Sequence, residues 1–448
     1  MLNEREIVLD MLVEILEKKG YSHLVIRSVL DKYNYADTKS KAFIKRVCEG
    51  TIERLITIDY ILDCFSKTPV KKMKPLIRNL LRMSVYQIVY MDYVPDSAAC
   101  NEAVKLAGKR GFRTLQGFVN GVLRTISRNK EQIPYPKKEQ DRIRYYSVQY
   151  SMPEWLVEHF LSGYGETQTI QMLEAIQRIH PVTVRYCKTE ECRREWLARL
   201  KKQQISVRQH PYEEQAFLLE ETENIRELPG YCEGEFAVQD VSSMLVTKAA
   251  SLSGDEFVLD VCAAPGGKAL HAAGSLPGGH VLARDLTEYK VAQIVENRER
   301  LQLANLEAEV YDASVLDENM IQKADVVYAD LPCSGLGIMG KKRDIRYRIS
   351  PEQMKELVKL QQEILSVVWQ YVKPGGILIY STCTIHKEEN EHMVKWFEEH
   401  FPFQRESLAP YLPKELQEKG EEGMLQLLPG IHKCDGFFLA RLRREKQE

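Results

Sequence analysis

The apolar residues of the first 130 positions recur with the spacing of amphipathic helices. One apolar stripe at positions i, i+3, i+4, i+7 and i+8 runs from Val8 to Leu16, and a second runs from Val119 to Ile126. Each stripe is typical of a helix with one buried face. Residues 74–95 are apolar on most sides, which predicts a largely buried helix that ends before Pro95. The pattern therefore predicts a bundle of six or seven helices with short loops.

After residue 140 the pattern changes twice. Residues 145–235 mix short helical and strand-like stretches, which predicts a small α+β segment. From about residue 236, apolar runs of buried-strand type alternate with helical stretches, as in a doubly wound parallel sheet. These runs read "EFVLDVCAA", "GHVLARDL", "LEAEVYDAS", "ADVVYADLP" and "GGILIYSTCT". The patterns predict an α/β protein with domains at residues 1–135, 140–235 and 236–448.

Composition narrows the class of protein. Of the 448 residues, 44% are hydrophobic and 28% are charged, which is typical of a soluble globular protein. No apolar run approaches the ~18 residues of a membrane helix, and the N-terminus is acidic where a secretion signal would be basic. Ten cysteines without close regular spacing suit free thiols in a reducing cytoplasm and no metal site. We therefore expect a cytoplasmic protein with no membrane partner.

The net charge of −2 is unevenly distributed along the chain. Residues 1–140 carry a net charge of +9, and the remaining residues carry −11. A basic N-terminal part indicates a polyanionic partner such as a nucleic acid, although small helical domains are often basic without one.

A small-molecule site is predicted at the ends of the strands. A Pro-Gly-Gly turn in "LDVCAAPGGK" lies between a strand and a helix, where free backbone N–H groups can meet a ligand. Asp285 follows Gly266 by 19 positions, the spacing of an acid that holds a ribose hydroxyl, and Asp312 follows the next strand. The turn matches neither dinucleotide nor triphosphate signatures, so it favours a ligand without a pyrophosphate, such as S-adenosylmethionine.

Two cysteines suit one demanding reaction. Cys333 and Cys383 each follow a buried strand and lie in turns rich in Pro, Ser or Thr. Methylating cytosine at C5 requires a thiolate to add to C6, after which the C5 proton leaves and the thiol is eliminated. One cysteine can attack while the other assists, but the residues alone do not say which does what.

At these residues the chain resembles the RNA cytosine-C5 methyltransferases of the Sun/Fmu (RsmB) type, over nearly its whole length. The motifs that carry the resemblance are "LDVCAAPGGK", "DLPCSGLG" and "YSTCT…EEN". The first 135 residues resemble a NusB-like RNA-binding domain, notably in "VPDSAACNEAVKLA" and "GFVNGVLR". The resemblance implies a Rossmann-like methyltransferase domain and 16S ribosomal RNA as partner and substrate, with cytosine 967 as the target. We expect a monomer.

The resemblance also implies roles for individual residues. Cys383 would attack, Cys333 would assist release, and Asp330 would lie between the cofactor and the target base. Asp285 would hold the ribose of the cofactor, and Asp312 would lie near its adenine. The loop lining S-adenosylmethionine would consist of Cys262, Ala263, Ala264, Pro265, Gly266, Gly267 and Lys268.

A basic segment directly after the "DLPCSGLG" motif is the predicted contact with RNA phosphates. Its members are Lys341, Lys342, Arg343, Arg346 and Arg348. Two other functions stay open at this stage. One is a nicotinamide-dependent oxidoreductase, which leaves both cysteines unexplained, and the other is a non-catalytic RNA-binding assembly factor.

Overall fold

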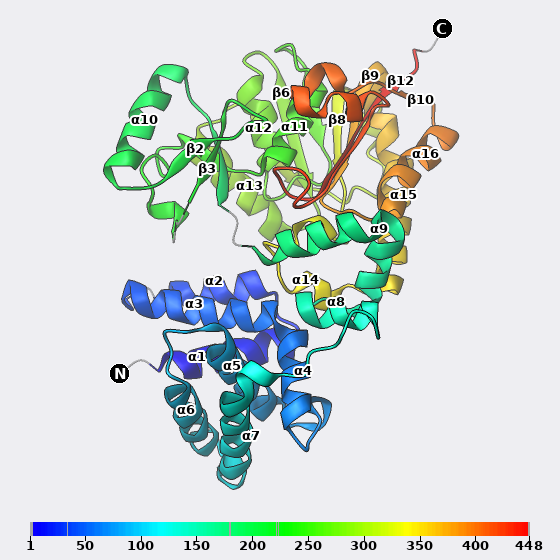
Figure 1. The fold of residues 1–448 in the computed structure, drawn as a ribbon. Helices are drawn as coiled ribbons and strands as arrows, with labels where there is room; N and C mark the ends of the chain where they lie inside the picture. Colours follow the sequence, from blue (N-terminus) through cyan, green and yellow to red (C-terminus); the bar gives the residue numbers. More distant parts are fainter. Residues whose placement is uncertain (1–2, 34, 179–180, 221, 223, 447–448) are drawn as a thin grey trace. The chain divides into compact units, whose positions relative to one another are not determined.

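The computed structural model describes residues 3–33, 35–178, 181–220, 222 and 224–446. The chain forms two compact units (Figure 1). The first comprises Met1–Gln177 and Lys341–Arg348, and the second comprises Arg178–Gly340 and Ile349–Glu448. The order of a helical part, a small sheet and a large mixed sheet confirms the predicted fold class.

Within its described residues, the regular structure of the first unit is entirely helical. Its helices are α1 (Glu4–Leu16), α2 (Ser22–Lys32), α3 (Thr38–Glu53), α4 (Leu55–Phe65), α5 (Pro75–Tyr90), α6 (Asp96–Lys109), α7 (Gln116–Asn129), α8 (Arg142–Tyr150), α9 (Glu154–Gln177) and the short α14 (Ile345–Arg348). Helix α5 packs against α1, α3, α4, α6 and α7, as expected for a helix that is apolar on most sides. Its buried Arg82 is neutralised by Asp59, with Nη2 and Oδ2 2.6 Å apart.

This unit extends well beyond residue 135, because α8 packs against α4. The hydroxyl of Thr57 on α4 donates a hydrogen bond to the backbone oxygen of Val148, 2.6 Å away. The backbone N–H of Ile56 donates to the hydroxyl of Ser151 at 2.9 Å. These contacts assign α8 to the helical unit, whereas the sequence pattern indicated a separate segment from residue 140.

A small antiparallel sheet opens the second unit. Its strands are β1 (Val182–Tyr186), β2 (Val207–Gln209), β3 (Ala216–Leu219) and β4 (Phe236–Val238), in the order β2-β3-β1-β4, and helix α10 (Glu190–Lys202) accompanies them. Trp196 on α10 is fully buried and packs against Tyr186 and Phe217. This core of large apolar residues stabilises a sheet of short strands.

The large sheet has eight strands in the order β10-β12-β9-β8-β5-β6-β7, with β11 paired to β12. The strands β5 to β9 run parallel, and β10, β11 and β12 pair in antiparallel fashion. The strands are β5 (Phe257–Asp260), β6 (His280–Asp285), β7 (Leu306–Val310), β8 (Ala324–Asp330), β9 (Val372–Thr382), β10 (Phe403–Arg405), β11 (Met424–Leu427) and β12 (Phe437–Arg444).

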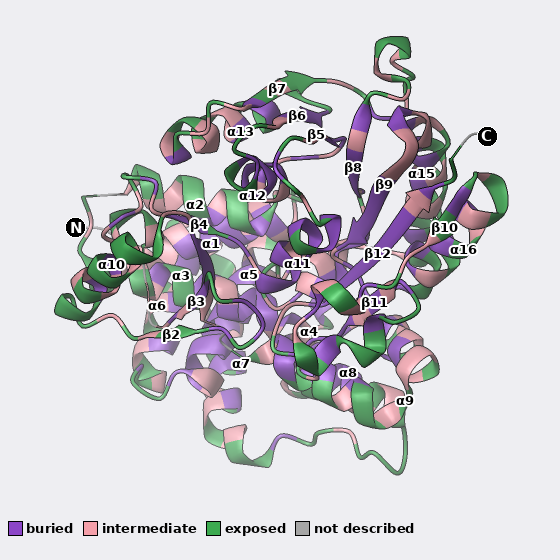
Figure 2. Ribbon diagram, turned by 90° about the horizontal axis from the view of Figure 1, so that it is seen from above, coloured by how far each residue is buried: buried purple, intermediate pink, exposed green. Residues whose placement is uncertain are grey.

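Helices cover both faces of this sheet, so its central strands are buried on both sides (Figure 2). In β8, Val326 and Tyr328 belong to one core and Val327 and Ala329 to the other, as the two-residue period of a strand requires. The helices are α11 (Val241–Ala250), α12 (Gly267–Ser275), α13 (Glu288–Leu301), α15 (Pro351–Val368) and α16 (Glu391–His400). Double burial explains the continuous apolar runs in the sequence.

The helices within the described ranges all fall short of the length or the hydropathy that a membrane span needs.

Candidate active site

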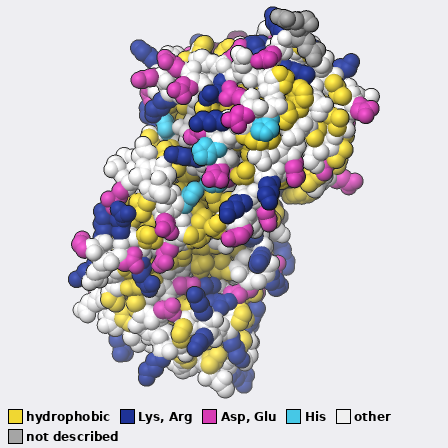
Figure 3. All heavy atoms as spheres, turned by 90° about the vertical axis from the view of Figure 1, so that its right-hand side faces the viewer, with side chains coloured by type: hydrophobic (Ala, Val, Ile, Leu, Met, Phe, Trp, Pro, Cys, Tyr) yellow, Lys and Arg dark blue, Asp and Glu magenta, His cyan; other side chains and the backbone are white. Residues whose placement is uncertain are grey.

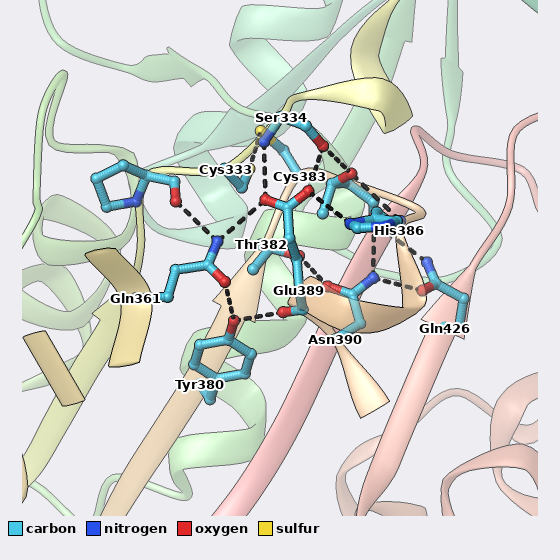
Figure 4. Close-up of polar contacts among 12 residues, drawn as sticks. Cys333, Ser334, Gln361, Tyr380, Thr382, Cys383, His386, Glu389, Asn390 and Gln426 are labelled. Atoms are coloured by element: carbon cyan, nitrogen blue, oxygen red, sulfur yellow. Dashed lines mark hydrogen bonds and ion pairs between the residues drawn. The ribbon is translucent and has the colours of Figure 1, made fainter. Parts of the chain in front are cut away.

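The two predicted thiols are in contact. Cys333 follows β8 and Cys383 follows β9, and because these strands are parallel neighbours, their carboxyl ends meet at one edge of the sheet. The Sγ atoms lie 3.3 Å apart, and both cysteines are half-buried and form no disulfide (Figure 4). The fold therefore joins two turns that are 50 positions apart in the sequence.

A glycine permits the two turns to approach closely. The backbone N–H of Gly337 donates a hydrogen bond to the carbonyl oxygen of Cys383 at 3.0 Å, and the Gly337 carbonyl accepts one from Gly436. A Cβ atom at Gly337 would collide with the backbone oxygen of Gly436. The "CSGLG" motif therefore needs a residue without a side chain here to contact the Cys383 turn.

Asp330 and Lys268 form an ion pair beside the thiols. The Nζ atom of Lys268 lies 2.6 Å from Oδ2 of Asp330, and the hydroxyl of Ser381 donates to Oδ1 at 2.7 Å. Burial alone would lower the pKa of Lys268, but the charges of Asp330, Asp260 and Cys383 raise it above its ordinary value. Lys268 is therefore a buried, persistently charged cation close to the thiol of Cys383.

The surroundings of Cys333 favour its protonated thiol. Its hydrogen bond with Cys383 and its burial raise the pKa of Cys333 well above the ordinary value, and the charge of Glu389 adds to the effect. A thiol of this kind is a poor nucleophile near neutral pH, but it can donate a proton or a hydrogen bond.

The predicted cofactor loop lies between β5 and α12. Gly266 adopts φ of +104° at the start of α12, a left-handed conformation that favours glycine. Asp285, buried at the end of β6, accepts hydrogen bonds from the backbone N–H of Ala264 at 2.9 Å and of Leu286 at 2.8 Å. Asp285 thus ties the loop to the neighbouring strand end. The backbone N–H groups of Ala263 and Gly266 are also bonded within the protein, and the role of this loop in cofactor binding stays a prediction.

Asp312 lies apart from this buried cluster. It follows β7, is exposed, and accepts hydrogen bonds from the backbone N–H and the hydroxyl of Ser314 at 2.9 and 2.7 Å. Those hydrogen bonds lower the pKa of Asp312, which keeps its carboxylate charged.

Asp260, at the end of β5, is a candidate that the sequence reasoning missed. It is 1% exposed, and neither carboxylate oxygen forms a hydrogen bond of ordinary geometry. Burial first, and then the charge of Asp330, raise the pKa of Asp260 to about 7. A buried carboxyl group without a partner is costly, so it indicates a cationic or hydrogen-bonding ligand. The available signal was one acidic residue within the apolar run "FVLDVC".

The predicted RNA-contacting segment is exposed at its two lysines and buried or half-buried at its three arginines. Arg343 forms ion pairs with Glu49 and Glu53 on α3 at 3.2 and 3.1 Å, and Arg346 is fully buried. Arg348 pairs with Asp344 at 2.6 Å. These three arginines anchor residues 341–348 within the helical unit, so the exposed part of the segment consists of Lys341 and Lys342.

The protein surface carries both signs of charge. Figure 3 shows Lys and Arg side chains interspersed with Asp and Glu over the face in view. In the part of the chain that the structure describes, no cluster of three or more His, Cys, Asp or Glu side chains has the geometry of a metal site.

Three family models match successive parts of the chain. Residues 2–128 match the NusB family, and residues 152–226 match the ferredoxin-like domain of RsmF/B-like methyltransferases. Residues 248–443 match the model described as 16S rRNA methyltransferase RsmB/F. The matches follow the order of helical part, small sheet and large sheet.

Relatives match the chain over nearly its whole length. It is 36% identical to the probable ribosomal RNA small subunit methyltransferase B of Bacillus subtilis, over 98% of each chain. It is 32% identical to ribosomal RNA small subunit methyltransferase B of Salmonella arizonae, over 90% of each chain. The solved structure of the protein PH0851 shares the fold, with a TM-score of 0.82 at 23% identity over 100% of this chain and 99% of that one. By its 36% and 32% identity to the two named methyltransferases over nearly their whole length, the chain belongs to the RsmB/F family of 16S rRNA methyltransferases.

Proposed function

We propose that this protein transfers a methyl group from S-adenosylmethionine to C5 of a cytosine in 16S ribosomal RNA, at position 967 as the resemblance implies. The observation that carries the proposal is the contact of Cys333 with Cys383, whose sulfurs lie 3.3 Å apart beside a buried lysine. Methyl transfer to a nitrogen atom would need no thiol, whereas methylation at C5 needs one group that attacks and one that assists release.

The site residues suit S-adenosylmethionine by their chemistry. The ligand carries an ammonium group, and the buried carboxyl of Asp260 lacks a partner. Asp285 would hold the ribose hydroxyls, and Asp312 would lie near the adenine. The loop from Cys262 to Lys268 would line the ligand through its backbone. When bound, the cofactor supplies an electrophilic methyl group on a sulfonium.

Cys383 is the proposed nucleophile. Its thiolate adds to C6 of the cytosine, which makes C5 electron-rich enough to accept the methyl group. The ammonium group of Lys268 interacts with Cys383 and favours its charged form. Asp330 shares its oxygens between Lys268 and Ser381, and would also meet the amino group or N3 of the base. Because C6 is inaccessible in a stacked duplex, the cytosine is unpaired or flipped out.

Cys333 is the proposed assistant in release. After methylation, a water molecule takes the C5 proton, and the C5–H electron pair re-forms the double bond between C5 and C6. The bond between C6 and Cys383 then breaks and its electron pair stays on the sulfur as a thiolate, which restores the aromatic ring. The raised pKa of Cys333 keeps it a thiol, in contact with the sulfur that must depart. A hydrogen bond from this thiol stabilises the departing thiolate.

Substitution of the two thiols tests the order of these roles. Cys383→Ser is expected to abolish methylation and leave no covalent protein–RNA adduct. Cys333→Ser is expected to slow release, so that an adduct accumulates and is seen as a shifted band on a denaturing gel. The reverse pattern would mean that Cys333 attacks.

The modified position is tested separately in cells. Bisulfite sequencing of 16S ribosomal RNA from cells with and without the gene identifies 5-methylcytosine and its location. One cytosine is expected to become convertible to uracil by bisulfite when the gene is removed. Unchanged protection at every cytosine would exclude C5 methylation of this RNA.

A further inference from the structure

A buried carboxylate lies directly behind the two thiols. Glu389 ends the 3-10 turn Lys387–Glu389 that follows the Cys383 turn, and its side chain is fully buried. One oxygen accepts hydrogen bonds from the backbone N–H of Ser334 at 2.9 Å and from Nε2 of Gln361 at 3.1 Å. The other accepts from the Ser334 hydroxyl at 2.5 Å, with Nδ1 of His386 3.3 Å away (Figure 4). No Lys or Arg ion pair to this carboxylate is found among the described residues.

The hydrogen bonds around Glu389 also hold residues next to both cysteines. Ser334 directly follows Cys333, and its hydroxyl also lies 2.6 Å from the hydroxyl of Thr384, which directly follows Cys383. Gln361 donates a second hydrogen bond to the carbonyl oxygen of Pro332, 2.8 Å away, on the other side of Cys333. Glu389 therefore holds both neighbours of Cys333, and one neighbour of Cys383, directly or through one partner.

A second layer fixes the backbone of Glu389 itself. The hydroxyl of Tyr380 on β9 donates to the carbonyl oxygen of Glu389 at 2.5 Å. Asn390 accepts from the Thr382 hydroxyl at 2.6 Å and donates to the carbonyl oxygen of Thr384 at 3.1 Å. The carboxylate therefore has little freedom to move away from the turns that it joins.

This arrangement needs an acceptor with two oxygens, even though a buried carboxylate loses more hydration energy than an amide would. It can accept from three donors with both oxygens, whereas an amide at the same position offers one acceptor and presents N–H groups to other donors. Its negative charge also disfavours a thiolate on Cys333.

We propose that Glu389 is a positioning residue that clamps the Cys333 turn to the Cys383 turn and keeps Cys333 in place as the proton-bearing partner during release. The inference rests on the proposed function only for its catalytic consequence. The clamp itself is a property of the free protein, so the two can fail separately.

The first experiment measures the clamp without RNA or cofactor. Full-length protein is alkylated with iodoacetamide across pH 6–10, and mass spectrometry follows Cys333 and Cys383 individually. Glu389→Gln is expected to speed alkylation of Cys333 by about tenfold at neutral pH, because the turn is released and the neighbouring charge is lost. Glu388→Gln, an exposed carboxylate on the same turn, is the matched control and should react as the wild type does.

The second experiment measures the catalytic consequence. With RNA and S-adenosylmethionine, Glu389→Gln is expected to form adduct at the wild-type rate, accumulate it and turn over about tenfold more slowly, as Cys333→Ser does. The double variant should be no slower than Cys333→Ser alone, because both changes remove one function. Ser334→Ala removes only the hydroxyl that donates to Glu389, so its adduct should accumulate to a smaller degree. This variant replaces Glu389→Gln in both experiments if Glu389→Gln does not fold.

The outcomes separate the two proposals. Unchanged Cys333 alkylation in both Glu389→Gln and Ser334→Ala, or additive losses in the double variant, would overturn the clamp. A second outcome is faster alkylation of Cys333 in Glu389→Gln together with no RNA adduct in Cys333→Ser. It would support the clamp and overturn the proposed mechanism.

Discussion

At the scale of single residues, the site sets two similar thiols apart by their surroundings. Cys383 interacts with the ammonium group of Lys268, whereas Cys333 contacts Cys383 and has the carboxylates of Glu389 and Asp330 nearby. A cation favours a thiolate, and burial with nearby anions favours a thiol. These surroundings support the proposed roles, in which Cys383 attacks and Cys333 donates.

Replacement of Lys268 tests this assignment. Lys268→Met removes the cation near Cys383 and leaves a side chain of similar length. Single-turnover methylation at pH 7 is expected to fall by about 10- to 100-fold, and the rate should recover as pH rises, because hydroxide then supplies the thiolate. Lys323→Met, at an exposed lysine before β8, is the control. A uniform loss at all pH values would contradict a role in ionising Cys383.

The raised pKa of Asp260 predicts a pH dependence of stability. The pKa rises from 3.8 to about 7 on folding, so the folded protein binds this proton more tightly. The contribution is fully present below pH 4 and is lost as pH rises through about 7. From pH 5 to pH 8, unfolding by urea should show the cofactor-free wild type losing up to a few kcal/mol more than Asp260→Asn. Equal losses in both proteins would show that Asp260 titrates near its ordinary value.

At the scale of elements, parallel pairing of β8 with β9 creates the site. The register that pairs Asp330 with Ser381 brings the two following turns level with each other. Gly337 then joins the turns by its backbone, and the loop after β5 supplies Lys268 from the other side of β8. The site is therefore built by the ends of three adjacent strands, a common location for ligands in open α/β sheets.

A side chain at Gly337 is expected to separate these elements. Gly337→Ala introduces a Cβ that collides with the Gly436 backbone, so the turns must shift. We expect a loss of about 1–3 kcal/mol in the free energy of unfolding and a larger relative loss of methylation. Gly274→Ala, whose added Cβ meets no neighbour within 4 Å, is the control. Wild-type stability and activity in Gly337→Ala would show that the turns tolerate the shift.

At the scale of the whole molecule, one short segment leaves the unit that contains the residues before and after it. It belongs instead to the other unit. Residues 341–348 follow the Cys333 motif but are part of the helical unit, anchored through Arg343, Arg346 and Arg348. The protein thus places a helical NusB-family fold and a methyltransferase fold in one chain that crosses between them more than once.

This anchoring predicts different results for neighbouring basic residues. Arg343→Ala breaks two ion pairs with α3 and should lower the free energy of unfolding by about 1–3 kcal/mol, measured by urea denaturation. Lys342→Ala, at an exposed side chain, should change stability by less than about 0.5 kcal/mol. If Lys342 contacts an RNA phosphate, its removal should also weaken the salt dependence of RNA binding. The slope of the logarithm of the binding constant against the logarithm of the salt concentration should then fall in magnitude by about one. A stable Arg343→Ala protein with weakened RNA binding would instead assign Arg343 to RNA.

Local structure and the expected class of reaction can be predicted from consecutive residues of the chain. Periodicity predicted the helices and the buried strands, because burial on one or two faces is recorded in consecutive residues. The motifs around Cys333, Cys383 and the glycine turn indicated the reaction class. The tertiary structure alone decided which residues meet: Lys268 with Asp330, Glu389 with Ser334, and Arg343 with α3. These pairs are far apart in the chain, and no local pattern encodes which strand ends and helices become neighbours in space.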